Sequence, residues 1–238
     1  MMLPDGRFVF QEENMNLTMI IVIGFAIDTA FIITDYMKKY IPAVILKTLA
    51  SLVFVYLGIR CAQLAGGGTY AHLIITGLAL GCAGDFFLNL RFVSSKYDEM
   101  CLKTGTAFFF AGHAVYIAAA VISGSRVYIA ALPLSIVLCL TIITVLLRKI
   151  DVKKELKPLG IIYFIIMIST FSFAAGLLIM TGATKFTKLL AAGAFIFMIS
   201  DILYILTQFG KIKRSWYNAA NLITYYTAQV MIALTIAL

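Results

Sequence analysis

The chain has 238 residues, of which 62% are hydrophobic and only 13% are charged, and its formal net charge is +8. Soluble domains carry about 25% charged residues, so this composition excludes a soluble globular protein. Apolar segments of about 20 residues, each able to cross a hydrocarbon core, follow one another along the chain. We therefore predict an all-α, polytopic membrane protein that forms a single integral membrane domain over residues 1–238.

Eight membrane-spanning helices are predicted, joined by short loops. In chain order they cover about 17–34, 43–60, 71–92, 104–122, 126–147, 158–181, 187–209 and 217–238. The segment before the first helix holds Asp5, Glu12 and Glu13 against a lone Arg7. This is the wrong charge for the basic start of a signal peptide, so we expect the first helix to stay in the mature protein.

Lysine and arginine predict the orientation of the bundle. The loops after the first, third, fifth and seventh helices hold thirteen of them, whereas the opposite side holds five. Because positively charged loops stay in the cytoplasm, both termini are predicted on the non-cytoplasmic side. The net charge thus reflects topology and contact with anionic lipid headgroups, with no nucleic acid as partner. The small size and short loops favour a bacterial inner (cytoplasmic) membrane, and nothing indicates a dimer.

Cysteine and histidine usage argues against a metal or cofactor. The four cysteines form no CxxC pair, and only two histidines exist, His72 near a helix start and His113 within the fourth helix. A zinc hydrolase needs three or four nitrogen, sulfur or carboxylate ligands at defined spacings. We therefore expect buried cysteines and no metal.

Two aspartates, Asp85 and Asp201, each lie inside a membrane-length apolar segment. An ionisable side chain at this depth is costly, usually faces the bundle interior and marks a functional site. We therefore predict that this pair forms the centre of the active site.

The surroundings of the two aspartates resemble each other at an offset of 116 residues. The offset also places Pro42 on Pro158 and His113 on Gln229. The pattern predicts two parallel four-helix repeats, about 17–122 and 126–238, related by a pseudo-two-fold axis along the membrane normal. Both aspartates would then face one shared cavity.

Further polar residues recur at helical spacing in the second, third, fourth, seventh and eighth segments, where they could line a pocket. The candidates for binding substrate are Lys47, Asn89, His113, Tyr116, Ser200, Tyr225 and Gln229. Each also has a structural interpretation. Lys47 would be a counter-ion to one aspartate, and the others would form hydrogen bonds or packing contacts between helices.

These segments resemble the YhhN-type membrane proteins, the lysoplasmalogenase family. The resemblance rests on GLALGCAGDFFLNL (77–90), TGTAFFFAGHAVYIAA (104–119), GAFIFMISDILYIL (193–206), NLITYYTAQVMIA (221–233) and the lysine-bearing ILKTLASLVFVYLG (45–58). It covers about residues 43–235. The motifs GD, GHxxY, SD and YYxxQ are specific in combination and weak singly.

The resemblance implies hydrolysis of the vinyl-ether bond of a lysoplasmalogen, a lysophospholipid held in the bilayer. A vinyl ether is cleaved by protonation of its β-carbon, and water adds to the resulting oxocarbenium ion. A carboxylic acid beside a carboxylate suits this chemistry, as in glycosidases. Asp85 and Asp201 would fill these two roles in undetermined order. Lys47 and His113 would tune the pair or hold the headgroup phosphate, and the remaining candidates would orient water and substrate.

Two rival functions remain open from the residues. Intramembrane Asp, Lys and His also suit a proton-coupled transporter of a small solute. A membrane protein that binds lysolipid without cleaving it would share the same pocket. Headgroup preference is not evident from the sequence.

Overall fold

The computed structural model describes residues 9–212, 214 and 216–238, with side chains from Asn16 onward. Within these ranges the chain forms eight α-helices and no β-strand, and each helix is long and apolar enough to cross a membrane. The helices are α1 (Val9–Tyr36), α2 (Tyr40–Ala65), α3 (Thr69–Leu90), α4 (Asp98–Ile122), α5 (Val127–Lys149), α6 (Lys157–Thr181), α7 (Lys185–Phe209) and α8 (Trp216–Leu234). The predicted all-α bundle of eight spans is confirmed, and most helices extend a few residues beyond the predicted limits. The acidic start of the chain falls partly on residues 1–8, which lie outside the described residues.

Short polar signals set several helix ends. Thr184 caps α7, since its hydroxyl accepts the Thr187 amide while the Thr187 hydroxyl accepts the Thr184 amide. α2 ends where Gly66 takes a left-handed conformation with φ of 78°, which glycine adopts at no steric cost. Pro158 lies in the first turn of α6, where its missing amide hydrogen costs nothing.

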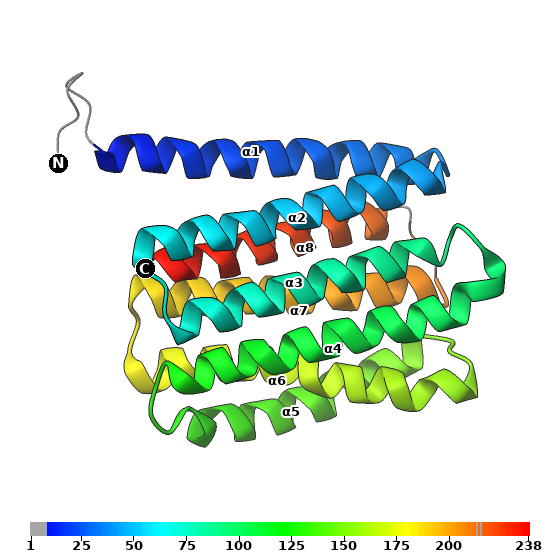
Figure 1. Cartoon of the computed structure of the whole chain (residues 1–238). Coiled ribbons are helices and arrows are strands. Elements are labelled where there is room, and N and C mark those ends of the chain that lie inside the picture. The colour runs from blue at the N-terminus through cyan, green and yellow to red at the C-terminus, as the bar shows by residue number, and fades with distance from the viewer. Residues whose placement is uncertain (1–8, 213, 215) are drawn as a thin grey trace.

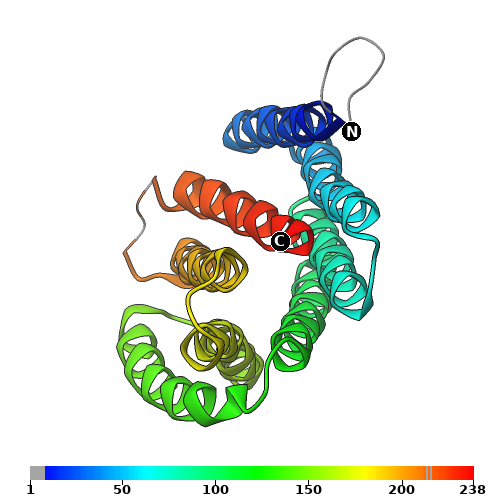
Figure 2. The same cartoon turned by 90° about the vertical axis from the view of Figure 1, so that its left-hand side faces the viewer.

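The helices run side by side along one direction (Figure 1), and the end-on view separates two groups. α2, α3 and α4 form one wall, and α8, α7 and α6 lie opposite them (Figure 2). α1 packs on α2 and α8, and α5 packs mainly on α6. The outward-facing side chains of α1 and α5 are mostly apolar, as expected of helices that face lipid.

The neighbours of the first four helices recur among the last four. The pairs α1–α2, α2–α3 and α3–α4 correspond to α5–α6, α6–α7 and α7–α8, and α4–α6 corresponds to α8–α2. A two-fold axis along the helices would produce this arrangement. The duplication of the sequence itself stays a prediction.

Small residues bring α3 and α4 into close contact. A Cβ atom added to Gly84 would meet the ring of Phe109 and, at 3.2 Å, the Gly105 carbonyl oxygen. Tyr116 lies in the same way directly against Gly77. These glycines allow α3 and α4 to approach each other without an intervening side chain, as the GxxxG spacing leads one to expect.

The main hydrophobic core fills the half of the bundle that contains the C-terminus. Phe54, Leu57, Ile74, Leu78 and Ile232 are buried there between α2, α3 and α8. This packing closes one end of the bundle. The opposite half is less completely filled and contains the candidate site.

Candidate functional site

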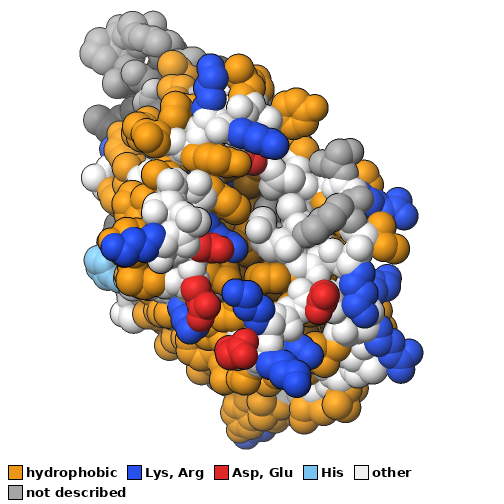
Figure 3. All heavy atoms as spheres, turned by 90° about the vertical axis from the view of Figure 1, so that its right-hand side faces the viewer, with side chains coloured by type: hydrophobic (Ala, Val, Ile, Leu, Met, Phe, Trp, Pro, Cys, Tyr) orange, Lys and Arg blue, Asp and Glu red, His pale blue; other side chains and the backbone are white. Residues whose placement is uncertain are grey.

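A pocket of about 490 Å³ lies between the two walls of the bundle, in the half that begins at the loops α1–α2, α3–α4, α5–α6 and α7–α8. Its size falls within the roughly 300–1,000 Å³ typical of small-molecule pockets. The end face of the molecule is hollowed at this point, and Lys and Arg side chains lie around the hollow with Asp and Glu among them (Figure 3). The pocket therefore opens at the end that the charge distribution predicts to be cytoplasmic.

Asp85 projects from α3 into this pocket and is only 5% exposed. The Ser51 hydroxyl on α2 donates a hydrogen bond to its Oδ2 atom. The Tyr225 hydroxyl on α8 also interacts with the Asp85 carboxyl group. Asp85 is thus approached by hydroxyl groups from two neighbouring helices.

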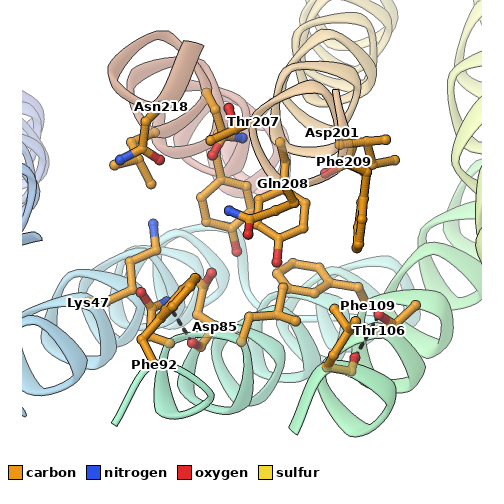
Figure 4. A pocket seen from close by; sticks show the side chains of 18 of the residues that line it. Lys47, Asp85, Phe92, Thr106, Phe109, Asp201, Thr207, Gln208, Phe209 and Asn218 are labelled. Carbon is orange, nitrogen blue, oxygen red and sulfur yellow. Dashed lines mark hydrogen bonds between the residues drawn. The ribbon is translucent and has the colours of Figure 1, made fainter. Parts of the chain in front are cut away.

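Lys47 of α2 lies on the same side of the pocket as Asp85 (Figure 4). Its side chain is 2% exposed, and its Nζ atom lies 4.5 Å from the centre of the Tyr225 ring. The structure pairs it with Asp28 of α1, at 3.7 Å between Nζ and Oδ1, and it also interacts electrostatically with Asp85. Neither Nζ nor the Asp28 Oδ1 atom has a hydrogen-bond partner among the described residues. Lys47 is therefore a buried cation close to two carboxyl groups.

Asp201 projects from α7, in the opposite wall, and is 7% exposed (Figure 4). The Tyr163 hydroxyl on α6 donates a hydrogen bond of 2.7 Å to its Oδ2 atom. The Nε2 atom of His113 on α4 lies 3.3 Å from the same oxygen and 3.4 Å from the Tyr163 hydroxyl. One carboxylate oxygen thus joins three helices.

The other ring nitrogen of His113 is held as well. Its Nδ1 atom lies 3.1 Å from the Thr170 hydroxyl on α6, and this hydroxyl donates to the backbone carbonyl of Ile166 at 3.0 Å. The His113 ring is 2% exposed and packs on the Phe197 ring at 4.7 Å between centroids. Its orientation toward Asp201 is therefore fixed from both sides.

A model of the YhhN family matches residues 17–236, and these residues include every side chain described above. The chain belongs to the YhhN family. Comparisons with curated proteins and with solved structures find no match.

The pocket of this YhhN protein collects five of the nine residues predicted for the site. Asp85, Asp201, Lys47, Asn89 and Tyr225 all line it. The Asn89 amide, however, donates to the backbone carbonyl of Asp85 at 2.9 Å. The Asn89 amide group is therefore partly engaged in a hydrogen bond within α3.

The other four predicted residues lie behind the pocket surface. His113 reaches the pocket only through Asp201 and Tyr163, as described above. The Tyr116 hydroxyl donates to Gln229 at 2.9 Å, and the Gln229 amide donates to the Tyr225 hydroxyl at 3.0 Å. Tyr116 and Gln229 thus support Tyr225 from behind.

Ser200 joins α7 to α8. Its hydroxyl donates to the Asn221 carbonyl at 3.1 Å, while the Asn221 amide donates to the Ser200 carbonyl at 2.8 Å and to the hydroxyl at 2.9 Å. This reciprocal pairing agrees with the structural interpretation of Ser200, in which it forms hydrogen bonds between helices. Asn221 itself does line the pocket.

Several residues of the site in this YhhN protein were not predicted. Tyr163 was not considered as a site residue because tyrosine is common in membrane helices and its segment is otherwise apolar. One signal was available, since Tyr163 follows Lys47 at the offset of 116 residues that also separates the two aspartates. No sequence signal connects Ser51 and Asp28 to Asp85 and Lys47.

The mouth of the pocket combines polar and aromatic side chains. The Asn218 amide of α8 donates to the Asp35 carboxylate of α1 at 2.8 Å. The rings of Tyr40 and Phe92 stack at 6.0 Å between centroids on the α2 and α3 side. The walls of the pocket also hold apolar groups, which include Leu88, Leu102, Phe109, Leu159, Phe164 and Leu222. The pocket can therefore accommodate a molecule that has both polar and apolar parts.

Proposed function

We propose that this YhhN protein hydrolyses the vinyl-ether bond of lysoplasmalogens, releasing a fatty aldehyde and a glycerophospho-alcohol, with Asp85 and Asp201 as the reacting carboxyl groups. The observation that carries the proposal is that two buried aspartates, from α3 and α7, line the same pocket. The family to which the chain belongs is known for lysoplasmalogenase activity.

The reaction needs a proton donor and a carboxylate on opposite sides of the bond. The donor adds a proton to the β-carbon of the alkenyl chain, which turns the ether into an oxocarbenium ion. The carboxylate stabilises this cation or removes a proton from the attacking water. Paired carboxyl groups perform the same two tasks in glycosidases, and one positioned acid or base contributes roughly 10²–10⁴-fold in rate.

The pocket also suits the rest of a lysolipid. Its mouth lies at the end of the membrane-spanning helices, where a phosphate headgroup would meet the lysine-rich surface. Its walls offer apolar side chains to the hydrocarbon chain. Addition of water to the oxocarbenium ion would give a hemiacetal. This hemiacetal would collapse in the pocket, breaking the bond to the glycerol oxygen.

The test is aldehyde release from a vinyl-ether lysophospholipid by purified protein in detergent. We expect Asp85→Asn and Asp201→Asn to lower the rate by at least about 100-fold, whereas Asp151→Asn, at an exposed carboxylate, leaves it unchanged. A chelator should have no effect on this two-carboxylate reaction. Wild-type rates in either aspartate variant would refute the proposal.

The transporter interpretation predicts a different result for the same purified protein. A proton-coupled carrier in proteoliposomes would move solute in response to a pH gradient, and it would release no aldehyde. Such a result would replace the proposed hydrolase by a transporter whose ion site is the aspartate pair.

A further inference from the structure

The two aspartates differ in the groups that face them, and this difference bears on which one donates the proton. The inference rests on the proposed function and deepens it. Asp85 is faced by the Ser51 and Tyr225 hydroxyls and by the Lys47 ammonium group, which is itself paired with the Asp28 carboxyl group. The question is whether any of these could take a proton from Asp85.

The two hydroxyls act as donors toward Asp85, whereas Lys47, paired with Asp28, adds a positive charge without a hydrogen bond. The Ser51 hydrogen is directed to Oδ2. The Tyr225 oxygen already accepts the Gln229 amide, so its own hydrogen is free for Asp85. An ammonium group has three donors and no acceptor. Donor hydroxyls and a nearby cation favour the carboxylate form of an acid.

Asp201 faces a group that can exchange a proton with it. The Thr170 hydroxyl donates to the Ile166 carbonyl, the usual bond of threonine within a helix. Its oxygen therefore accepts from Nδ1 of His113, and Nδ1 carries a hydrogen. The Nε2 atom, 3.3 Å from Asp201, is then the site at which one proton is shared between imidazole and carboxyl.

We infer that Asp201, together with His113, is the proton donor of the reaction, and that Asp85 is the carboxylate that stabilises the oxocarbenium ion. Tyr163 is a positioning residue, because its hydroxyl fixes the Oδ2 atom of Asp201 at the edge of the pocket that both residues line. The positive charge of Lys47 favours the carboxylate form of Asp85.

The assignment gives a balanced sequence of steps. The Asp201 proton bonds to the β-carbon with the electron pair of the double bond, which leaves the cation on the ether carbon and oxygen beside Asp85. Water adds its oxygen to that carbon and returns a proton to Asp201. The hemiacetal hydroxyl then loses its proton as the bond to the glycerol oxygen breaks, and that oxygen takes up a proton. The overall reaction consumes one water and regenerates both aspartates.

A binding experiment tests the assignment without turnover. Two uncleavable lysolipids are compared by calorimetry: a saturated alkyl ether, and its analogue in which a protonated secondary amine replaces the ether oxygen. The amine mimics the charge of the oxocarbenium ion. The measured quantity is the ratio of the two affinities, which cancels the common contribution of the tail and headgroup.

We expect the wild type to prefer the amine and Asp85→Asn to reduce this ratio by about 30-fold or more, as when one partner of a buried charge pair is removed. Asp201→Asn and His113→Gln should change the ratio less than about threefold, since the charge that binds the amine remains. A larger reduction in Asp201→Asn than in Asp85→Asn, equal reductions in both, or no saturable binding of either lipid would overturn the assignment.

Different results would refute the proposed hydrolase activity and the assignment of roles to the two aspartates. A wild type that shows the expected ratios but releases no aldehyde would refute the hydrolase and leave the charge assignment standing. Aldehyde release with equal ratios in both variants would refute only the assignment.

The protonation of Nδ1 in the His113 ring can be measured while both aspartates are in place. In protein with ¹⁵N-labelled histidine, His72→Asn removes the only other histidine, which is exposed at the far end of α3. We expect a protonated Nδ1 and an Nε2 signal that shifts in Asp201→Asn but not in Asp85→Asn. An unprotonated Nδ1 would overturn the inference even if both aspartate variants failed to fold.

Discussion

The Tyr163 hydroxyl donates a 2.7 Å hydrogen bond to the Oδ2 atom of Asp201, across the α6–α7 contact. This hydroxyl also lies 3.4 Å from Nε2 of His113, so it joins the imidazole and the carboxyl group on the side that borders the pocket. The relationship implies that Tyr163 sets the direction in which Asp201 presents its free oxygen.

Tyr163→Phe removes this hydrogen bond and keeps the ring. Hydrogen bonds to charged groups contribute about 1.5–3 kcal/mol, and Asp201 gains its charge as it releases the proton, so we expect kcat for aldehyde release to fall by about 10- to 100-fold with little change in KM. Tyr128→Phe, at an exposed position of α5, serves as the control and should be silent. An unchanged kcat in Tyr163→Phe would show that Asp201 does not depend on this contact.

Lys47→Met should destabilise the protein strongly. It leaves the Asp28 carboxyl group, 2% exposed, without its cation, and breaking a buried pair from one side costs about 3–5 kcal/mol. The double variant Asp28→Asn/Lys47→Met should recover much of that stability, because Asp28 no longer leaves an unpaired charge. Thermal unfolding in detergent measures both. Additive losses in the double variant would mean that the two side chains do not form a pair.

Gly84→Ala tests the close approach of α3 and α4. The added methyl group would meet the Phe109 ring, which lines the pocket, and the Gly105 carbonyl. Overpacking of this kind costs about 1–3 kcal/mol, so we expect a lower unfolding temperature and a weaker affinity for lysolipid. Gly160→Ala is the matched control for the unfolding temperature, since its methyl group would meet nothing within 4 Å. Equal unfolding temperatures in the two variants would contradict the packing described.

Ser200→Ala separates interhelical bonding from substrate binding. The hydroxyl pairs with Asn221 of α8, and hydrogen bonds between membrane helices contribute about 0.6 kcal/mol on average. We expect a slightly lower unfolding temperature, while kcat and KM of the folded protein stay unchanged. A rise in KM would instead place Ser200 against the substrate.

The orientation in the membrane can be tested by chemical labelling of intact cells. Lys96→Cys lies at the pocket end, and Ala183→Cys lies in the loop at the opposite end. We expect an impermeant maleimide to label only Ala183→Cys from outside, because the lysine-rich end should face the cytoplasm. The unsubstituted protein is the control, since its own cysteines are buried or half-buried. Labelling of Lys96→Cys from outside would reverse the predicted topology.

The sequence predicted the eight helices because length and apolar composition are local properties that each segment carries by itself. It also singled out the two aspartates, since a charge in an apolar segment needs no partner to be noticed. The pairing of Asp201 with Tyr163 could not be read in the same way. It depends on the packing of α6 against α7, and a tyrosine in an apolar helix gives no sign of what its hydroxyl will meet.

The predicted binding residues show the same limit. Gln229 and Tyr116 were singled out as polar groups on otherwise apolar helices, yet in the structure they bond to each other. Helical periodicity indicates which face of a helix turns inward. It does not distinguish the side chains that reach a cavity from those that pack one layer behind it.

The predicted duplication makes Lys47 and Tyr163 equivalent positions, and this has a consequence for the origin of the site. In a dimer of two identical four-helix chains, both aspartates would have the same neighbour at this position, either a lysine or a tyrosine. Joining both halves in one chain frees each copy to change alone, so that one aspartate can keep a cation beside it and the other a phenol. Division of labour between two originally interchangeable acids would then be a result of gene fusion, and restoring the symmetry, with lysine or tyrosine at both positions, would return the pair to equivalence.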